Sequence, residues 1–233
     1  MKLGIMQPYL FPYIGYFQLI QAVDKFVLYD DVNYINKGWI NRNQILVNGK
    51  AHMFTIPLKE ASQNKKINEI EVSDEKVWKE KLLKTLTMTY KNASMYSEVY
   101  PVVESILSFD KNNLSAFIHN SIVRLCQYMR IATTVIPTST IYANQELKGQ
   151  NRILDICDLE KAGMYINPTN GRSLYQQEEF LRKGIHLKFI QTRNVAYRQY
   201  SDTTFIPYLS IIDVLMFNNN EDLKRMLIEY DLD

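Results

Sequence analysis

Uncharged side chains that can stack and hydrogen-bond gather in a short segment near the start of the chain. Residues 7–20 read QPYLFPYIGYFQLI, and none of them is charged. The candidates for ligand contact are Gln7, Tyr9, Tyr13, Gly15 and Tyr16. Tyrosine rings have flat apolar faces and polar tips, which suit stacking on a base or a sugar ring, and a glycine lets the backbone approach a ligand closely. The segment predicts a binding loop; alternatively, its rings are core and turn aromatics.

Charged side chains follow in residues 30–44, DDVNYINKGWINRNQ. Asp30 and Asp31 have the chemistry to bind a ribose hydroxyl, an amine or a metal, and one of them is expected to orient or deprotonate an attacking amine. A carboxylate is a weak base for an ammonium, so burial would have to raise its pKa. Arg42 offers a planar fork for phosphate or carboxylate. Further contacts are expected from Lys37, Trp39, Asn41 and Asn43; alternatively, the segment is a polar loop and hairpin with solvated charges.

Other polar positions later in the chain have two interpretations each. Ser210 and Asp213 stand at capping-box spacing, with Asp in place of the usual Glu, and predict a helix cap or a catalytic pair. The N-terminus of their helix could also hold an anion. Arg152 either reaches the edge of the sheet or is solvated. A lysine run is either an exposed helix face or a surface for an acidic partner, such as a carrier protein or the anionic inner leaflet of a membrane. It comprises Lys76, Lys79, Lys81, Lys84 and Lys91.

The elements that must position these residues begin with a βαβ unit. Strand, helix and strand are predicted at residues 3–6, 14–23 and 25–30, a spacing that makes the two strands parallel. The segments 7–16 and 30–43 then follow the carboxyl ends of neighbouring strands. Ligands of open parallel sheets bind outside those ends, so the two segments are expected to wall one crevice.

A hairpin, a helical block and a return to α/β alternation are predicted for the rest of the chain. Asn48-Gly49, within 39–58, is the dipeptide most typical of a type I′ turn. Helical periodicity dominates 75–131, with Asp74 as the expected N-cap and Pro101 in the first turn of a new helix. The helix is expected to restart at Asn112 or Asn113. Strands are expected at 66–73, 133–137, 164–167 and 186–191, and the strand at 186–191 is expected to be the final one. Further helices are expected at 150–162, ended by Gly163 in a left-handed cap, and from 209.

This order of elements predicts an α/β fold with a Rossmann-like (HUP-like) parallel sheet. A β-hairpin and a helical insertion at about 75–131 interrupt the alternation. We find no internal repeat or low-complexity tract at which to divide the chain. A single domain over residues 1–233 is therefore expected.

Composition narrows the classes of function. The 233 residues carry a formal net charge of +2, so bulk charge gives no support to nucleic-acid binding. No apolar run approaches the roughly 20 residues of a membrane span and no signal peptide is recognised, so a cytoplasmic location is expected. Cys126 and Cys157 lie in apolar helical patterns and are expected to be core thiols. Three dispersed histidines predict neither a metal site nor a Ser–His–acid triad.

Three stretches, taken together, resemble the WbqC-like family along nearly the whole chain. They are MQPYLFPYIGYFQLI, FVLYDDVNYINKGWINRNQI and FIPYLSIIDVLMFN. The resemblance implies a role in the synthesis of O-antigen or another surface polysaccharide and, for some members, a glycine (aminoacyl) transferase activity. Residues 169–175, TNGRSLY, depart from the expected pattern, so the resemblance gives only weak support to a site role for Asn170 to Tyr175.

The tetrad Tyr13-Ile14-Gly15-Tyr16 also resembles, remotely, the His-x-Gly-His cluster of HIGH-motif nucleotidyltransferases. In that family the histidines stabilise a triphosphate at the start of the first helix. Both imidazoles are replaced here by tyrosine, which carries no positive charge at neutral pH. Adenylyl transfer by the usual route is therefore not expected from this tetrad.

We expect a transferase that moves an aminoacyl (glycyl) or acyl group to a nucleotide-activated amino sugar in surface-polysaccharide synthesis. In this hypothesis the tyrosines stack on the base or sugar, and Arg42 binds phosphate. The expected substrates are a nucleotide-linked sugar and an activated amino acid; no cofactor is specified, and ATP is a further candidate substrate. The alternatives are an adenylate-forming, nucleotidyltransferase-like enzyme and a non-catalytic binding protein of the same pathway.

Overall fold

The computed structural model describes residues 1–193, 195–200 and 205–233. Its largest sheet has six strands in the order β10-β9-β8-β1-β2-β7, and all neighbours are parallel except β10, which runs antiparallel to β9. The strands are β1 (Lys2–Met6), β2 (Lys25–Leu28), β7 (Thr134–Ile136), β8 (Met164–Pro168), β9 (His186–Thr192) and β10 (Tyr230–Leu232). This is the Rossmann-like α/β architecture that the sequence predicts.

The order of the strands reverses at β1. From β1 the chain passes through α1 (Ile14–Ala22) to β2 and later to β7, the edge strand beyond β2. It then returns through α5 (Gly149–Leu159) to β8, on the other side of β1. Gly4 is accordingly paired with Phe26 of β2 and with Ile166 of β8. Such a reversal leaves a crevice at the carboxyl ends of the two central strands.

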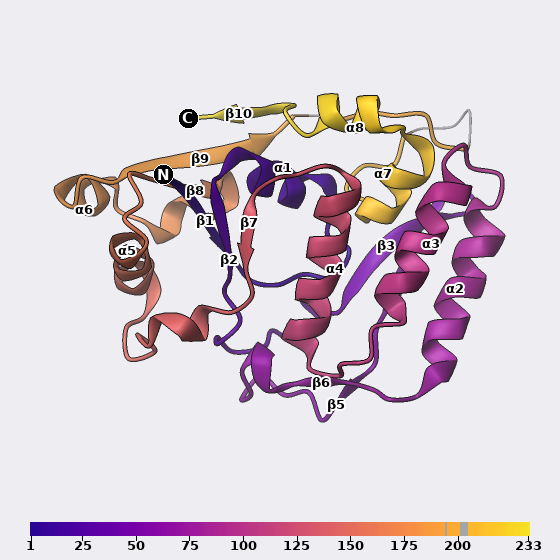
Figure 1. Ribbon diagram of the computed structural model, residues 1–233, viewed down its shortest axis with the longest axis horizontal. Coiled ribbons are helices and arrows are strands. Elements are labelled where there is room, and N and C mark those ends of the chain that lie inside the picture. The colour runs from indigo at the N-terminus through magenta and orange to yellow at the C-terminus, as the bar shows by residue number, and fades with distance from the viewer. Residues whose placement is uncertain (194, 201–204) are drawn as a thin grey trace.

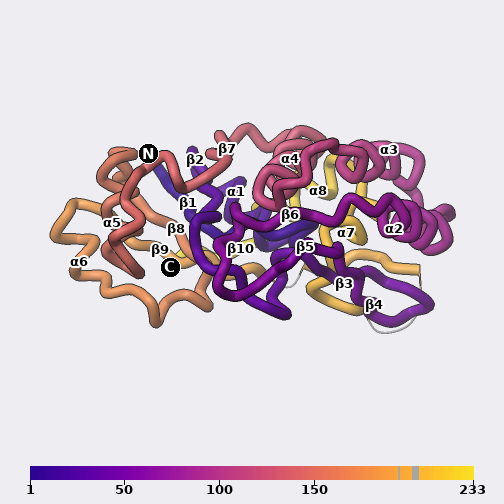
Figure 2. The backbone as a smooth tube through the Cα atoms, turned by 90° about the horizontal axis from the view of Figure 1, so that it is seen from below, coloured from indigo at the N-terminus to yellow at the C-terminus, as the bar shows by residue number. Residues whose placement is uncertain are grey.

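Helices cover both faces of this sheet (Figure 1). Side chains alternate along a strand, so Leu3 and Ile5 of β1 pack with α5 and with Phe180 of α6 (Gln177–Arg182) in one apolar cluster. The other face belongs to a larger cluster that includes α1 and α7 (Ile211–Phe217). In Figures 1 and 2, α5 and α6 lie at one end of the molecule and the helical block lies at the other.

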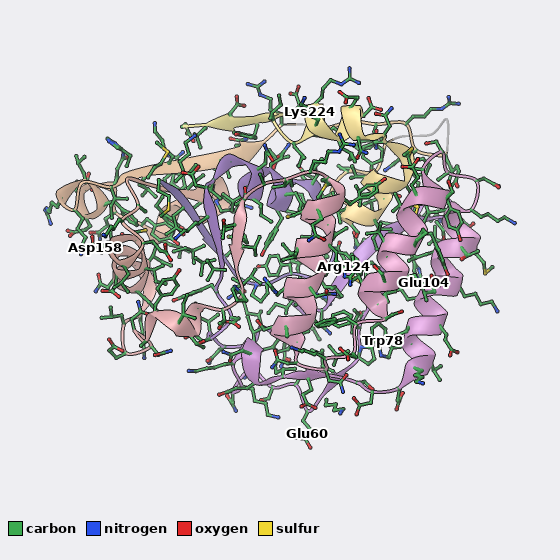
Figure 3. The ribbon with its side chains drawn as sticks, in the orientation of Figure 1. Glu60, Trp78, Glu104, Arg124, Asp158 and Lys224 are labelled. Atoms are coloured by element: carbon green, nitrogen blue, oxygen red, sulfur yellow. The ribbon has the colours of Figure 1, made fainter. Side chains whose placement is uncertain are left out.

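The helical block comprises α2 (Lys76–Tyr90), α3 (Tyr96–Leu107) and α4 (Leu114–Tyr128). Asn113 caps α4, as predicted, because its side chain accepts a hydrogen bond from the Ala116 amide at 3.0 Å. Two local predictions are wrong. Asp74 bonds Lys59 and Asn112 instead of capping α2, and Pro101 lies inside α3 rather than in its first turn. Figure 3 shows Trp78 and Glu104 on this block and Asp158 on α5 at the opposite end.

The predicted hairpin is present, as β3 (Arg42–Val47) and β4 (Lys50–Thr55). Asn48 and Gly49 both have positive φ, at 49° and 71°, as a type I′ turn requires. Of the strand predicted at 66–73 only the end forms: β6 (Glu71–Val72) pairs with β5 (Leu58–Lys59) and follows a 3-10 helix, η1 (Ile67–Glu69). Two more 3-10 helices are η2 (Ser139–Tyr142) and η3 (Thr169–Leu174).

Two features near chain turns differ from the predictions. Lys161, with φ 54°, takes the left-handed conformation expected of Gly163. After α7, Asn219 caps a further helix, α8 (Asn220–Met226), for which no prediction was made from the sequence. The chain then adds β10 after the strand predicted to be the last. In the described part of the chain, no helix combines the length and apolar character that crossing a bilayer requires.

Candidate functional site

A cavity of about 1260 Å³ opens at the carboxyl edge of the sheet. Its walls come from the loops after β1, β2 and β8, from the start of α5, and from the segment 207–208 that precedes α7. This edge is where doubly wound sheets bind ligands. The volume exceeds the roughly 300–1,000 Å³ of a typical small-molecule site, so the cavity has room for one extended substrate or for two smaller ones.

The predicted site residues divide into two groups. Those that line the cavity are Gln7, Tyr9, Tyr13, Gly15, Tyr16, Asp31, Trp39 and Asn43. Those that do not line it are Asp30, Lys37, Asn41, Arg42, Ser210 and Asp213. The loop after β1 and the end of β2 therefore meet at one cavity, whereas the charged residues proposed for catalysis are mostly elsewhere.

A buried ion pair lines the cavity beside β2. Arg152, in the first turns of α5, donates from Nη2 to Asp31 Oδ2 at 2.5 Å, and the two side chains are 3% and 1% exposed. Arg152 also donates from Nε to Asn144 Oδ1 at 3.0 Å, and its guanidinium lies 4.9 Å from the centre of the Tyr29 ring. Of the two positions open to Arg152 from the sequence, the sheet edge is the one observed.

The surroundings of Asp31 hold it ionised. Burial alone would raise its pKa, but hydrogen bonds from Arg152 and Ser139, with the Arg152 charge, outweigh burial and lower it. The same pairing raises the pKa of Arg152 against its own burial. A base in this segment would need burial to raise its pKa. The structure instead offers an ionised carboxylate that is a weak base and that accepts hydrogen bonds on both oxygens.

Asp30 turns away from the cavity. Its carboxylate accepts hydrogen bonds from Ser115 Oγ at 2.5 Å, Thr138 Oγ1 at 2.8 Å and the Ser139 amide at 3.1 Å. Ser139 Oγ also hydrogen-bonds Asp31, so one serine connects the two adjacent carboxylates. Asp30 borders a separate cavity of about 550 Å³. This geometry gives Asp30 a supporting position behind Asp31 rather than contact with a ligand in the large cavity.

The loop after β1 is held by two distant segments. Phe11 has a positive φ of 45°, and its carbonyl accepts hydrogen bonds from Asn43 Nδ2 at 2.7 Å and Ser210 Oγ at 2.8 Å. Ser210 also caps α7 by accepting from the Ile212 amide at 3.3 Å, which confirms the predicted N-cap. Asn43 and Ser210 thus fix the shape of the loop, and Asn43 borders the cavity as well.

The tyrosines of that loop have unequal roles. Tyr16 is only 3% exposed and donates its hydroxyl to the Gln7 carbonyl at 2.9 Å, so it supports the cavity wall from behind. Tyr9 and Tyr13 are partly exposed, and burial raises the pKa of each. Their hydroxyls therefore stay protonated at neutral pH and serve as hydrogen-bond donors or acceptors, not as bases.

Gly15 does not leave open space for a ligand on its side-chain side. A Cβ at this position would collide with the Tyr13 ring and with Thr192 Oγ1. The glycine is required because these two side chains pack directly over the first turn of α1. The start of α1 is therefore covered by the ring of Tyr13.

Arg42 is used within its own turn. It donates from Nε to the Gly38 carbonyl at 2.8 Å and from Nη2 to the carbonyl of Lys37, which has a φ of 58°. Its guanidinium lies 5.7 Å from the centre of the Trp39 ring, and Trp39 is 46% exposed at the cavity. Arg42 therefore positions Trp39. Asn41 is similarly structural, because its amide bonds Tyr34 and the Ile56 carbonyl at 2.8 Å each.

Asp213 forms a second buried centre, separate from the cavity. It accepts hydrogen bonds from the hydroxyls of Tyr90 at 2.6 Å and Tyr197 at 2.5 Å and from Gln199 Nε2 at 3.2 Å. Burial raises the pKa of Asp213, and the hydrogen bonds oppose that rise only in part. The side chain does not return to the start of α7 to complete the predicted capping box; it joins α7 to α2 and to residues 197–199 instead.

Sequence reasoning missed one wall of the cavity. Asn170, Gly171, Leu174 and Tyr175, from the segment with only weak support for a site role, all line it, as do Lys66 and Lys148. The available signal was topological, because the loop after β8 must face the loop after β1 across the reversal in strand order. Neither lysine forms an ion pair with any carboxylate in the described residues. Both can therefore offer charge to an anionic ligand.

The remaining candidates are structural. Cys126 and Cys157 are buried in the two apolar clusters, and burial raises the pKa of each thiol to about 12. Burial lowers the pKa of His119, which lies at the smaller cavity. Within the described ranges, no group of three or more histidine, cysteine, aspartate or glutamate side chains is arranged to hold a metal ion.

Comparisons with known proteins identify a family and a relative to which the chain is similar. The model of the WbqC-like protein family matches residues 7–225. The uncharacterized protein Rv1507c of Mycobacterium tuberculosis (strain ATCC 25618 / H37Rv) is 28% identical over 221 residues, which cover 93% of this chain and 93% of that protein. No solved structure gives a significant match. The match to the family spans the loops after β1, β2 and β8 and the residues that hold them.

Proposed function

The chain belongs to the WbqC-like protein family, and from this membership and the cavity we propose that it transfers an acyl or aminoacyl group to a nucleotide-linked amino sugar. The setting that the family suggests is the synthesis of O-antigen or another surface polysaccharide. The observation that carries the proposal is the cavity at the reversal in strand order, with Asp31 and Arg152 paired in its wall and tyrosines and two lysines around it.

The contents of the cavity match the parts of such a substrate. Lys66 and Lys148 supply positive charge for a diphosphate, as ammonium donors do at phosphate sites. Aromatic side chains supply stacking surfaces for a planar base or a sugar ring. Neutral amides from Gln7, Asn167 and Asn170 supply donors and acceptors for sugar hydroxyls.

The chemistry assigned to the protein is orientation more than proton removal. The amine nitrogen attacks the activated carbonyl carbon, a carbon–nitrogen bond forms, the bond to the leaving group breaks, and the amine loses a proton. Asp31, held ionised by Arg152, accepts a hydrogen bond from the amine and aims its lone pair. The proton passes to the leaving group or to water, because Asp31 is too weak a base to keep it. Positioning two substrates in one enclosed site supplies most of the acceleration.

The test is a mass-spectrometric assay with nucleotide-linked amino sugars and activated acyl or glycyl donors. We expect a mass gain on the sugar equal to the transferred group. Lys66→Ala and Lys148→Ala should each weaken binding of the nucleotide-linked sugar about tenfold, since a hydrogen bond to a charged group is lost. The matched control is Lys91→Ala, which replaces an exposed lysine just after α2 and should leave binding of the nucleotide-linked sugar unchanged.

The outcomes separate the alternatives. Tight binding of the sugar nucleotide without any mass gain would remove the transferase activity and leave a binding protein. Stabilisation by ATP and magnesium, with formation of an adenylate, would replace the proposal by the adenylate-forming alternative. Full affinity in both lysine variants would place the substrate outside this cavity.

A further inference from the structure

We propose that Tyr208 is a stacking platform for the nucleobase of the substrate at the mouth of the cavity. The inference rests on the proposed function for the class of ligand, and it adds the residue that recognises the base. Tyr208 belongs to the stretch FIPYLSIIDVLMFN. The roles proposed for the Asp31–Arg152 pair and for the lysines leave its ring without a function.

Tyr208 combines high exposure with an unfavourable backbone conformation. It lines the cavity, the residue is 70% exposed, and its φ is 58°. A residue with a Cβ disfavours left-handed backbone, and a large ring in water gains nothing from burial to offset that cost. Strained residues cluster at ligand sites, where the surrounding structure holds them in place.

The neighbours of Tyr208 hold its position. Leu209, which follows it, is only 2% exposed, and the Ser210 amide donates to the Gln44 carbonyl at 2.8 Å. The ring of Tyr13 lies 6.2 Å from that of Tyr208, centre to centre, at an interplanar angle of 69°. Tyr13 thus contacts Tyr208 edge to face, a geometry that leaves much of the Tyr208 ring exposed for another planar group.

Tyr208 differs in position from the other left-handed residues. Asn48 occupies a type I′ turn, and Lys161 follows the end of α5. Phe11 is fully buried, and its carbonyl is fixed by two side-chain hydrogen bonds. Among the non-glycine residues with positive φ in the described ranges, only Tyr208 lines the cavity. Its conformation therefore presents an exposed ring to a bound ligand.

The ligand chemistry follows from what shares the cavity with Tyr208. Trp39 is a second exposed aromatic ring in its lining, and Lys66 and Lys148 provide positive charge. A molecule that uses both features carries a flat aromatic group and an anionic group. A nucleoside diphosphate has this combination, and base–aromatic stacking is tolerant of base identity.

Binding measurements by calorimetry with the full-length protein test the assignment. The probes are the four common nucleoside diphosphates, with inorganic pyrophosphate as the base-free probe. Tyr208→Ala should weaken nucleoside diphosphate binding about tenfold or more and leave pyrophosphate binding unchanged. Tyr208→Phe should bind as the wild type does, because stacking uses the ring and not the hydroxyl.

A second pair of variants measures the strain. Tyr208→Gly and Tyr208→Ala lose the same ring, and glycine alone accepts the left-handed backbone freely. Tyr208→Gly should therefore melt about 2–4 °C above Tyr208→Ala while binding nucleotides as weakly. Lys161→Gly, at a left-handed residue outside the cavity, is the control and should keep wild-type nucleotide affinity.

Wild-type nucleotide affinity in both Tyr208→Ala and Tyr208→Gly overturns the assignment, as does equal weakening for pyrophosphate. Either result can occur while group transfer persists, in which case the proposed function stands without this residue. If nucleotide binding depends on Tyr208 but the protein shows no group transfer, the assignment of Tyr208 stands and the proposed transferase function fails.

Discussion

Asp31 and Asp213 are both almost completely buried, yet their surroundings are opposite. Asp31 pairs with the Arg152 guanidinium and borders the large cavity, whereas Asp213 is held by neutral donors, chiefly the hydroxyls of Tyr90 and Tyr197. The pKa of the first is lowered and that of the second is raised. Burial of a carboxylate therefore does not by itself mark a site. The adjoining cation and cavity distinguish the centre suited to ligand binding from the one that joins elements.

The largest effect is expected where the charge pair is broken. Arg152→Met leaves the Asp31 carboxylate buried without its cation, which should lower the free energy of unfolding by about 3–5 kcal/mol. Urea unfolding measures the loss. Adding Asp31→Asn to Arg152→Met should recover a large part of it, because the uncompensated charge is removed. A loss below about 1 kcal/mol would show that the pair is solvated and would erase its contrast with Asp213.

A change in pH is expected to have an intermediate effect on the free energy of unfolding. The effect is on the order of 1 kcal/mol for each unit by which a native pKa differs from its unfolded value. The native pKa of Asp31 lies below its unfolded value of about 3.9, so its contribution is present above that pH and is lost as pH falls through the native value. The native pKa of Asp213 lies above its unfolded value. Its contribution is present below about pH 3.9 and is lost as pH rises through the native value.

Unfolding of the wild type, Asp31→Asn and Asp213→Asn between pH 3 and 7 checks these signs. The stability difference between wild type and variant should increase with pH for Asp31 and decrease with pH for Asp213. Slopes of the same sign would mean that the two carboxylates share one kind of environment.

The smallest effect is expected from an arginine that belongs to neither centre. Arg42→Ala removes a partly exposed contact with Trp39 and two hydrogen bonds to carbonyls of its own turn, and should cost about 1 kcal/mol of stability. Nucleotide affinity, measured by calorimetry, should change by less than about threefold. If affinity is abolished while the protein stays folded, Arg42 contacts the ligand directly, and the charged part of the site extends beyond the Asp31–Arg152 pair.

The sequence predicted the architecture well because the relevant signals are local. Alternating apolar strands and helices specified the βαβ unit, and Asn48-Gly49 specified the hairpin. Errors arose where a tertiary contact decided the outcome. Asp74 bonds Lys59 and Asn112 instead of capping α2, and β10 forms only because β9 is present to pair with it.

The site was predicted in part, for a related reason. Position after β1 and β2 located the loop with Tyr13 and the carboxylate of Asp31 at the cavity. Position alone does not show where a side chain points, and adjacent residues of an extended segment face opposite sides. Asp30 therefore faces the smaller cavity while Asp31 faces the large one. Arg42 is also not at the cavity, because it hydrogen-bonds carbonyls of its own turn. Arg152 comes from an element about 120 residues away, and no local pattern pairs it with Asp31.

The clamp on the Phe11 carbonyl has a consequence for the synthesis of the protein. Ser210 reaches back across 199 positions of sequence to make its bond. A nascent chain cannot complete this wall of the cavity until α7 has been synthesised and can fold back onto the loop after β1. Contacts of such long range are slow to form. Completion of the cavity wall therefore depends on a contact of long range, and a chain that stops before Ser210 lacks the clamp.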